Sequence, residues 1–337
     1  MGPRKSHPPV LALMLFVPMW ILAGGAPTAA PQPAAADSPA ESKPDDKVRL
    51  IIRTDDIGFC HGVNAAIERI LGSGQVTAVS VIVNTPWLPE AVEILNRHPE
   101  VSVGVHLCLN SEWREYRWGP VLGADRVPSL VDQFGYFHGS RAALMRGRPK
   151  PEEVEQELRA QVDRAIEMGL PVSYVDYHMG AAMGAREFQQ AVERIARDYQ
   201  IGISRYFGEQ DTQSVYKTPP AGKVEDAVRI LDSLTTPGLY LMVVHPGSDT
   251  PEMAAMSDLN PGGLTNMSAH RQAEADMLCD PRFREALERR GIELVGYKQL
   301  DLTMMKRPFE APPYEEAVEA AITAQPPNPY GMFEKKR

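Results

Sequence analysis

The chain has 337 residues, of which 43% are hydrophobic and 23% are charged, and this composition is typical of a globular protein rather than of a disordered chain. Its length allows one large α/β domain or two smaller ones. The formal net charge of -9 argues against nucleic acid as a partner, because no surplus of Lys and Arg exists to neutralise phosphates.

The N-terminus predicts an export signal. Arg4 and Lys5 give a positive start, residues 10–25 form an apolar run, and small residues follow with candidate cleavage sites, for example after Ala30 or Ala36. The run is short for a membrane span, although an uncleaved anchor is the alternative. We therefore expect residues 1–30 to be a signal peptide that sends the protein to the periplasm or outside the cell, with no stable membrane span after cleavage.

The chain from residue 31 onward divides into a linker, a domain and a tail. Residues 31–47, rich in Ala, Pro, Ser and Asp, predict a flexible linker. Short β-rich runs then alternate with amphipathic patterns. The predicted strands cover residues 48–54, 76–84, 101–110, 171–178, 201–205, 238–247 and 292–297. The predicted helices cover residues 62–74, 88–99, 151–169, 185–199, 223–234 and 268–291, the last of them interrupted by Pro281.

This alternation predicts parallel strands joined by crossover helices on both faces of a sheet. Seven strands in about 250 residues favour an irregular (β/α) barrel over residues 48–302, with an open doubly wound sheet as the alternative. Residues 111–150 lack periodicity and are predicted to be an insertion over one face. Residues 303–337 contain six prolines and one helical piece, so we expect a C-terminal tail.

The cysteines do not indicate a disulfide framework, because there are three of them and they are widely spaced. They are Cys60, Cys108 and Cys279. Buried thiols are expected at Cys60 and Cys108, and a bridge between these two in an oxidising compartment is the alternative.

Acidic and imidazole side chains gather at the ends of four predicted strands. They are Asp55 and Asp56, His106, Asp176 with His178, and His245. The carboxyl ends of parallel strands share one edge of a sheet, and active sites form there. Two adjacent carboxylates at the end of a buried strand would repel each other and raise one pKa, unless a cation or hydrogen bonds offset the cost.

A divalent metal ion offers the simplest compensation. Asp56, His106 and His178 would form a three-ligand set with open positions for water and substrate, suited to Zn²⁺ but also open to Mg²⁺, Mn²⁺ or Co²⁺. Asp55 would then remove a proton from water at this site. His245 would protonate a leaving group or stabilise an oxyanion.

Each assignment has a structural alternative. Asp176 would orient a histidine or touch the metal site, but a strand-end His can be purely structural and an Asp pair can cap the next helix. The hypothesis of one shared site depends on four strand ends coinciding. The aromatic residues Trp87, Trp113, Tyr116 and Trp118 are candidates for stacking on sugar rings or for anchoring a loop.

Five segments, in order, resemble the YdjC/ChbG-like carbohydrate deacetylases. They are "TDDIGFCHGVNAAI", "VGVHLCLN", "YVDYH", "VVHPGSD" and the stretch from "HRQAEADML" to "VGYKQL", all within residues 48–302. The resemblance implies a distorted (β/α) barrel and a metal-dependent hydrolase that removes acetyl groups from N-acetylated sugars. It implies metal binding by Asp56, His106 and His178, a base at Asp55 and an acid or oxyanion role for His245.

The sequence departs from the family pattern at several positions. Gly180 stands where the family often has a second His, and Thr54 and Ile57 replace the usual Ala and Phe. The export signal also departs, because relatives that act on imported disaccharides are cytoplasmic. The leading hypothesis is therefore an exported amidohydrolase with a carbohydrate substrate. An O-deacetylase or esterase of envelope glycans, a non-catalytic glycan-binding protein and a homodimeric assembly stay open.

Overall fold

The structure is a computed structural model that describes residues 46–324. The predicted signal peptide, all but the last two residues of the predicted linker, and residues 325–337 of the predicted tail lie outside this segment. Within residues 46–324, no helix combines the length and the hydrophobicity needed to cross a bilayer.

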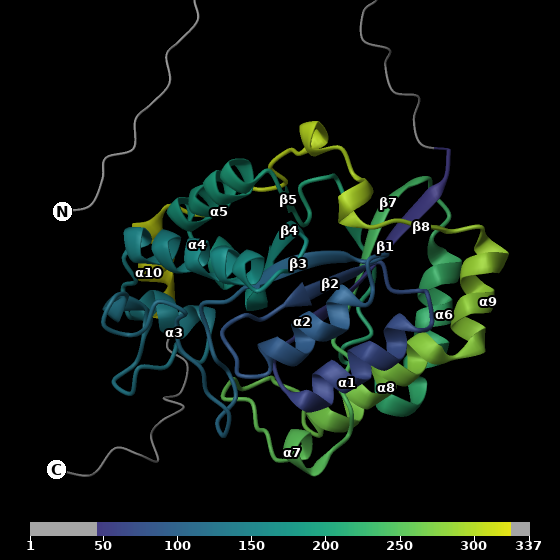
Figure 1. Ribbon diagram of the computed structural model, residues 1–337, viewed down its shortest axis with the longest axis horizontal. Helices are drawn as coiled ribbons and strands as arrows, with labels where there is room; N and C mark the ends of the chain where they lie inside the picture. Colours follow the sequence, from purple (N-terminus) through teal and green to yellow (C-terminus); the bar gives the residue numbers. More distant parts are fainter. Residues whose placement is uncertain (1–45, 325–337) are drawn as a thin grey trace, which may run out of the picture. The chain divides into compact units, whose positions relative to one another are not determined.

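Eight parallel strands of the described segment form one curled sheet (Figure 1). They are β1 (Val48–Ile57), β2 (Ala78–Val81), β3 (Ser102–Leu107), β4 (Val172–Tyr177), β5 (Gly202–Ile203), β6 (Gln210–Asp211), β7 (Gly238–Val244) and β8 (Glu293–Leu294). The order across the sheet is β5-β4-β3-β2-β1-β7-β6, and β8 pairs with β1. The predicted parallel (β/α) architecture is confirmed.

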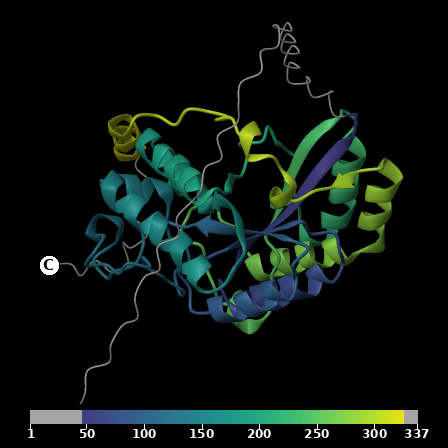
Figure 2. The ribbon, with the colours of Figure 1, turned by 45° about the horizontal axis from the view of Figure 1, so that its top comes forward.

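Helices cover the outer surface of the sheet (Figure 2). They are α1 (His61–Leu71), α2 (Leu88–Asn96), α3 (Arg141–Arg146), α4 (Pro151–Glu167), α5 (Arg186–Tyr199), α6 (Lys223–Ser233), α7 (Pro251–Ala254), α8 (Met267–Cys279), α9 (Pro281–Arg290) and α10 (Tyr314–Thr323). Short 3-10 turns are η1 (Pro128–Leu130), η2 (His178–Met183), η3 (Pro220–Gly222), η4 (Tyr297–Gln299) and η5 (Leu302–Met304). In α1 the apolar side chains at helical spacing, Val63, Ile67 and Ile70, are all buried.

The barrel is open rather than closed. β5 and β6 are the two ends of the strand order and do not pair with each other. β1 pairs with β7 along one edge. Along its other edge it pairs first with β8, at Arg49 and Leu50, and then with β2, from Arg53 onward. The sequence predicted seven strands. It missed β6 because this strand is only two exposed polar residues long and so carries no apolar alternation.

Packed aromatic rings fill the concave side of the sheet below its carboxyl end. Tyr174 of β4 stacks on Tyr297 with 4.1 Å between ring centroids. The hydroxyl of Tyr174 is hydrogen-bonded to Ser80, and that of Tyr297 to Ser204. A Cβ added at Gly104 of β3 would lie 2.3 Å from the Tyr174 ring, so this position needs glycine. A cavity lies above this filled interior, at the carboxyl ends of the strands.

Two peripheral segments complete the described chain. The stretch between β3 and α4 runs as an irregular loop, as predicted, but it also contains η1 and α3. The described part of the predicted tail is ordered, because α10 packs on α3 and buries Ala317, Val318 and Ala321.

Candidate metal centre and active site

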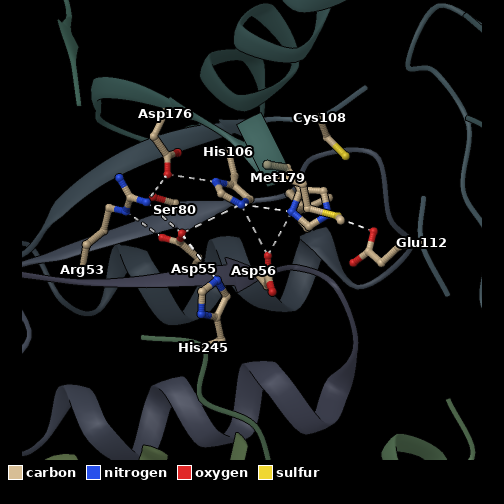
Figure 3. A network of polar contacts seen from close by, with 12 residues as sticks. Arg53, Asp55, Asp56, Ser80, His106, Cys108, Glu112, Asp176, Met179 and His245 are labelled. Carbon is tan, nitrogen blue, oxygen red and sulfur yellow. Dashed lines mark hydrogen bonds and ion pairs between the residues drawn. The ribbon is translucent and has the colours of Figure 1, made fainter. Parts of the chain in front are cut away.

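The carboxyl ends of β1, β3, β4 and β7 meet at one cavity of about 560 Å³. Figure 3 shows the polar side chains that gather there, among them Asp55, Asp56, His106 and His245. Five of the six site residues predicted from the sequence line the cavity: Asp55, Asp56, His106, His178 and His245. The sixth, Asp176, is fully buried behind His106. The structure therefore brings together side chains that are up to 190 residues apart in sequence (positions 55 and 245).

Both carboxylates at the end of β1 face this cavity because the strand is distorted there. Neighbouring residues of a regular strand point to opposite faces, but Asp56 has a left-handed backbone with φ 76°, and the pairing of β1 with β2 shifts register between Thr54 and Ile57. Asp tolerates this conformation better than most residues. Gly58, with φ 91° and no room for a Cβ beside the Ile82 carbonyl, completes the turn into α1.

Three potential metal ligands converge in the cavity. His106 Nε2 lies 3.2 Å from His178 Nδ1, and each nitrogen lies 3.5 Å from Asp56 Oδ1. Among residues 46–324, this buried carboxylate oxygen has no hydrogen-bond partner. Ligand atoms around a tetrahedral ion with bonds of about 2.0–2.1 Å lie about 3.3 Å apart. The donor set and its spacing therefore fit a divalent cation.

A buried carboxylate supports each of the two imidazoles. The pairs are His106 Nδ1 with Asp176 Oδ2 and His178 Nε2 with Glu112 Oε2, each at 2.9 Å. Burial alone lowers the pKa of His106, but Asp176 and Asp55 outweigh it and the net shift is upward. Burial likewise lowers the pKa of His178, and Glu112 is the main group that reverses this and raises it well above the ordinary value.

Two buried arginines neutralise the aspartates. Arg53 donates to both oxygens of Asp55, at 2.7 and 2.8 Å, and also contacts Asp176 at 2.9 Å. Arg271 of α8 donates to Asp56 Oδ2 at 2.7 Å. Burial raises the pKa of both aspartates, but the neighbouring cationic groups together reverse this. Arg53, with His106 and His245, lowers the pKa of Asp55. Arg271, with His178 and His245, brings the pKa of Asp56 well below its ordinary value. Both carboxylates are therefore held ionised.

His245 lies apart from the ligand cluster. Its side chain is 28% exposed, and its Nε2 atom is 3.9 Å from Asp55 Oδ2. The edge of its ring meets Tyr216, and its backbone N–H donates to Glu274 of α8 at 2.6 Å. His245 is thus the site imidazole that is most accessible to a bound molecule.

Sequence reasoning missed the charged side chains that contact the two aspartates and the ligand histidines: Arg53, Glu112 and Arg271. Arg53 had a usable signal, since it is a charge inside a buried strand and, two residues before Asp55, lies on the same face. Arg271 lies in the stretch that begins with "HRQAEADML", which indicates a family resemblance but no role for this residue. Glu112 lies in an irregular loop and carries no periodic signal.

Most of the aromatic and cysteine side chains that the sequence singled out lie away from the cavity. Of the four aromatic candidates, only Trp113 lines the cavity. Trp118 is buried and its indole N–H points to Cys108 Sγ at 3.3 Å. Cys60 and Cys108 are free buried thiols and Cys279 is a free exposed one, so the bridge that was kept as an alternative is absent.

Comparison with known proteins gives the family. The model of the YdjC-like protein family matches residues 49–289. This chain belongs to the YdjC-like family. The match covers the whole described site, from Arg53 to Glu274.

Several relatives share the name carbohydrate deacetylase. A protein of Brevibacillus brevis named carbohydrate deacetylase is 28% identical over 269 residues, which is 75% of this chain and 100% of that protein. A carbohydrate deacetylase of Thermus thermophilus is 31% identical over 260 residues, covering 71% and 89%. A crystal structure from Enterococcus faecalis, described as a cellobiose-phosphate cleavage protein, has the same fold at 24% identity, with a TM-score of 0.64 and coverage of 75% and 98%.

Proposed function

We propose that this protein is a metal-dependent hydrolase that removes acetyl groups from N-acetylated amino sugars or their oligomers. One observation carries the proposal: the unpartnered Oδ1 of Asp56 and two imidazole nitrogens converge beside a cavity that also holds Asp55 and His245. Membership in a family whose relatives are named carbohydrate deacetylases supports the choice of reaction.

Asp56, His106 and His178 hold the cation in this proposal. When bound, a divalent ion would polarise the acetyl carbonyl and lower the pKa of a water molecule. The chain itself holds the ligand atoms in place: Arg271 keeps Asp56 ionised, and Asp176 fixes the imidazole of His106. The identity of the metal, Zn²⁺ or Mg²⁺ among others, is a matter for elemental analysis of the purified protein.

Asp55 accepts the proton of the attacking water. Arg53 occupies one lone pair on each of its oxygens, and each oxygen has a second lone pair for a further hydrogen bond. Because Arg53 lowers the pKa of Asp55, the carboxylate stays ionised. Arg53 also fixes its orientation, and the lower pKa makes Asp55 a weaker base. Oδ2 is the oxygen nearer to both His106 and His245, at 4.0 and 3.9 Å from their Nε2 atoms, and so is suited to this step.

His245 delivers a proton to the departing amine. Its exposed Nε2 edge reaches the cavity from the side of Asp55. Cleavage of the acetamide C–N bond then yields acetate and the free amino sugar, and the proton taken by Asp55 balances the one given by His245. Trp113 and Tyr216, which also line the cavity, are suited to contact a sugar ring.

The experiment is a measurement of acetate release from N-acetylglucosamine oligomers and from O-acetylated sugars, with and without a chelator. We expect metal-dependent release from the N-acetyl substrates. Release from the O-acetyl substrates alone would replace the proposal by an esterase function. Tight glycan binding with no turnover of any acetylated sugar, with metal bound, would indicate a binding protein.

Asp55→Asn tests the role of the base. The variant keeps the shape of the side chain but is a much weaker proton acceptor, so kcat should fall about 10²–10⁴-fold while metal content is unchanged. Asp276→Asn on the exposed face of α8 is the control, and should keep wild-type activity. A wild-type kcat in Asp55→Asn would remove Asp55 from the mechanism.

We also propose that the protein is exported by residues 1–30. The charged start and the apolar run of residues 10–25 support this. N-terminal sequencing of protein recovered outside the cytoplasm should find a start near Pro31. A retained Met1 would overturn the proposal.

A further inference from the structure

Glu112 is a buried carboxylate that comes from an irregular loop and ends on an imidazole of the ligand cluster. Its side chain is 5% exposed, and its Oε2 atom lies 2.9 Å from His178 Nε2 (Figure 3). The same oxygen accepts from Asn110 Nδ2 at 3.5 Å. Burying a carboxylate in this way is costly unless a strong donor faces it.

We propose that Glu112 is a positioning residue that makes His178 bind the metal ion through Nδ1. The inference rests on the metal centre of the proposed function. A neutral imidazole has one N–H and one lone pair. By accepting the N–H at Nε2, Glu112 leaves the lone pair at Nδ1, the atom that faces His106 and Asp56.

The neighbouring histidine has the opposite arrangement. Asp176 accepts the N–H of Nδ1 of His106, which leaves the lone pair at Nε2, the atom that faces the ligand cluster. Two carboxylates thus fix two imidazoles in opposite tautomers, so that the lone pairs of both rings point at one place. A hydrogen-bonded carboxylate also makes the imidazole a better donor to a metal.

The loop that carries Glu112 is held by a second loop. The N–H of Leu259 donates to the carbonyl of Glu112 at 2.8 Å, and the N–H of Arg114 donates to the carbonyl of Ser257 at 2.9 Å. Trp113, between them, forms an antiparallel bridge with Asp258. The backbone of Glu112 is therefore fixed from outside the cluster, and the carboxylate does not have to follow movements of His178.

The first test is metal affinity, measured by calorimetric titration of the metal-free full-length protein with Zn²⁺ and with Co²⁺. Glu112→Ala should weaken binding about 10–100-fold, the usual range for loss of such a partner. Glu112→Gln retains an oxygen that accepts from Nε2, so its loss should be smaller. Unchanged affinity in Glu112→Ala would overturn the proposal.

Glu115→Ala is the matched control on the same loop. Glu115 is exposed and accepts from the N–H of Ser257 at 2.8 Å and from its hydroxyl, so it stabilises the same pair of loops without touching His178. Its substitution should leave metal affinity within about twofold of wild type. If Glu115→Ala and Glu112→Ala lose metal affinity equally, the effect comes from the order of the two loops, and the positioning role of Glu112 is rejected.

The second test reads the ring atoms directly and does not need a variant. Nitrogen NMR of the Zn²⁺-loaded protein labelled with ¹⁵N-histidine should show His178 coordinated at Nδ1 with a proton on Nε2, and His106 coordinated at Nε2. Coordination of His178 through Nε2 would overturn the proposal even if Glu112→Ala fails to fold. A lack of acetate release by the wild type would reject the proposed function. The metal affinities and the NMR assignment would still test the role of Glu112, because neither depends on turnover.

Discussion

Arg53 compensates two carboxylates at once in the floor of the site. Its guanidinium donates to both oxygens of Asp55 and contacts Asp176, and its Nη1 atom donates to Ser204 at 2.7 Å. All four side chains are buried. A planar guanidinium suits such a bidentate pair, whereas the point charge of a lysine does not.

Replacing Arg53 should therefore be costly. Arg53→Met leaves buried carboxylates without their cation, and we expect the free energy of unfolding to fall by about 3–5 kcal/mol, as measured by urea denaturation. Arg69→Met, which breaks the exposed pair with Asp276, is the control, with a loss of about 1 kcal/mol or less. Equal losses in the two variants would contradict a specific role for the buried pair.

The sequence predicted the residue types of the site better than their environment. Asp55, His106 and His245 could be grouped because strand ends in a parallel fold share one edge. The side chains that neutralise and orient these residues could not be predicted in this way, because the partners of a tertiary ion pair have no fixed separation in sequence. Arg271 lies 215 residues from its partner Asp56, and nothing local to either residue indicates the contact.

Helix α8 connects the two sides of the site. Arg271 and Glu274, one turn apart, reach Asp56 and the backbone of His245 respectively. Lys223 at the start of α6 is fully buried and donates to Glu274 Oε1 at 2.9 Å. It also donates to the carbonyls of Val215 and Tyr216, at 2.8 and 3.2 Å. The cation thus fixes α8 together with a wall of the cavity.

Lys223→Met should destabilise the protein and loosen the site. Loss of the cation leaves Glu274 buried with only its bond to His245, so we expect a loss of about 3–5 kcal/mol in the free energy of unfolding. On the same helix, Arg229→Met breaks an exposed pair with Asp226 and should cost about 1 kcal/mol or less. A Lys223→Met protein as stable as Arg229→Met would disprove this account.

Glu155 joins α4 to α5 through a partly exposed ion network. Arg194 of α5 and then Arg159 of α4 lower the pKa of Glu155 below its ordinary value of 4.5. The unfolded chain therefore binds a proton at a higher pH than the folded one does. The stabilisation is complete above pH 4.5 and is lost as the pH falls through the lower folded value.

Glu155→Gln should consequently show a pH-dependent difference from wild type. At pH 7 we expect the variant to be less stable by about 0.5–1 kcal/mol, because the pair is partly exposed. Denaturation series from pH 7 down to pH 3 should show this difference shrinking toward zero. A difference that is constant over the series would mean that packing, rather than charge, makes the contribution.

The long elements were predicted well and the short ones poorly. The helices α4, α5 and α6 have regular apolar spacing with clear ends, and each was found within one or two residues of its observed limits. The strands β5 and β8 have two residues each, and their predicted lengths were too long. Such strands are defined by their partners in the sheet, which the local sequence does not specify.

Metal binding should stabilise the whole folded domain, because the three ligands come from different strand ends and meet only in the native state. At a free metal concentration 100 times Kd, the gain is about 2.7 kcal/mol. This corresponds to a rise in Tm of roughly 5–10 °C. Thermal melts of chelator-treated and Zn²⁺-loaded protein measure it. Asp56→Asn should show a much smaller rise, and equal Tm values for the two wild-type forms would contradict the proposed centre.

The distance in sequence between Asp56 and Arg271 has a consequence for synthesis. Arg53 and Asp55 leave the ribosome together, so that pair can form early. Asp56 must wait for a further 215 residues to be polymerised. An interrupted translation product that stops before α8 therefore carries an uncompensated carboxylate at the end of β1. Such a fragment is expected to stay open at this end of the sheet and to be sensitive to proteases.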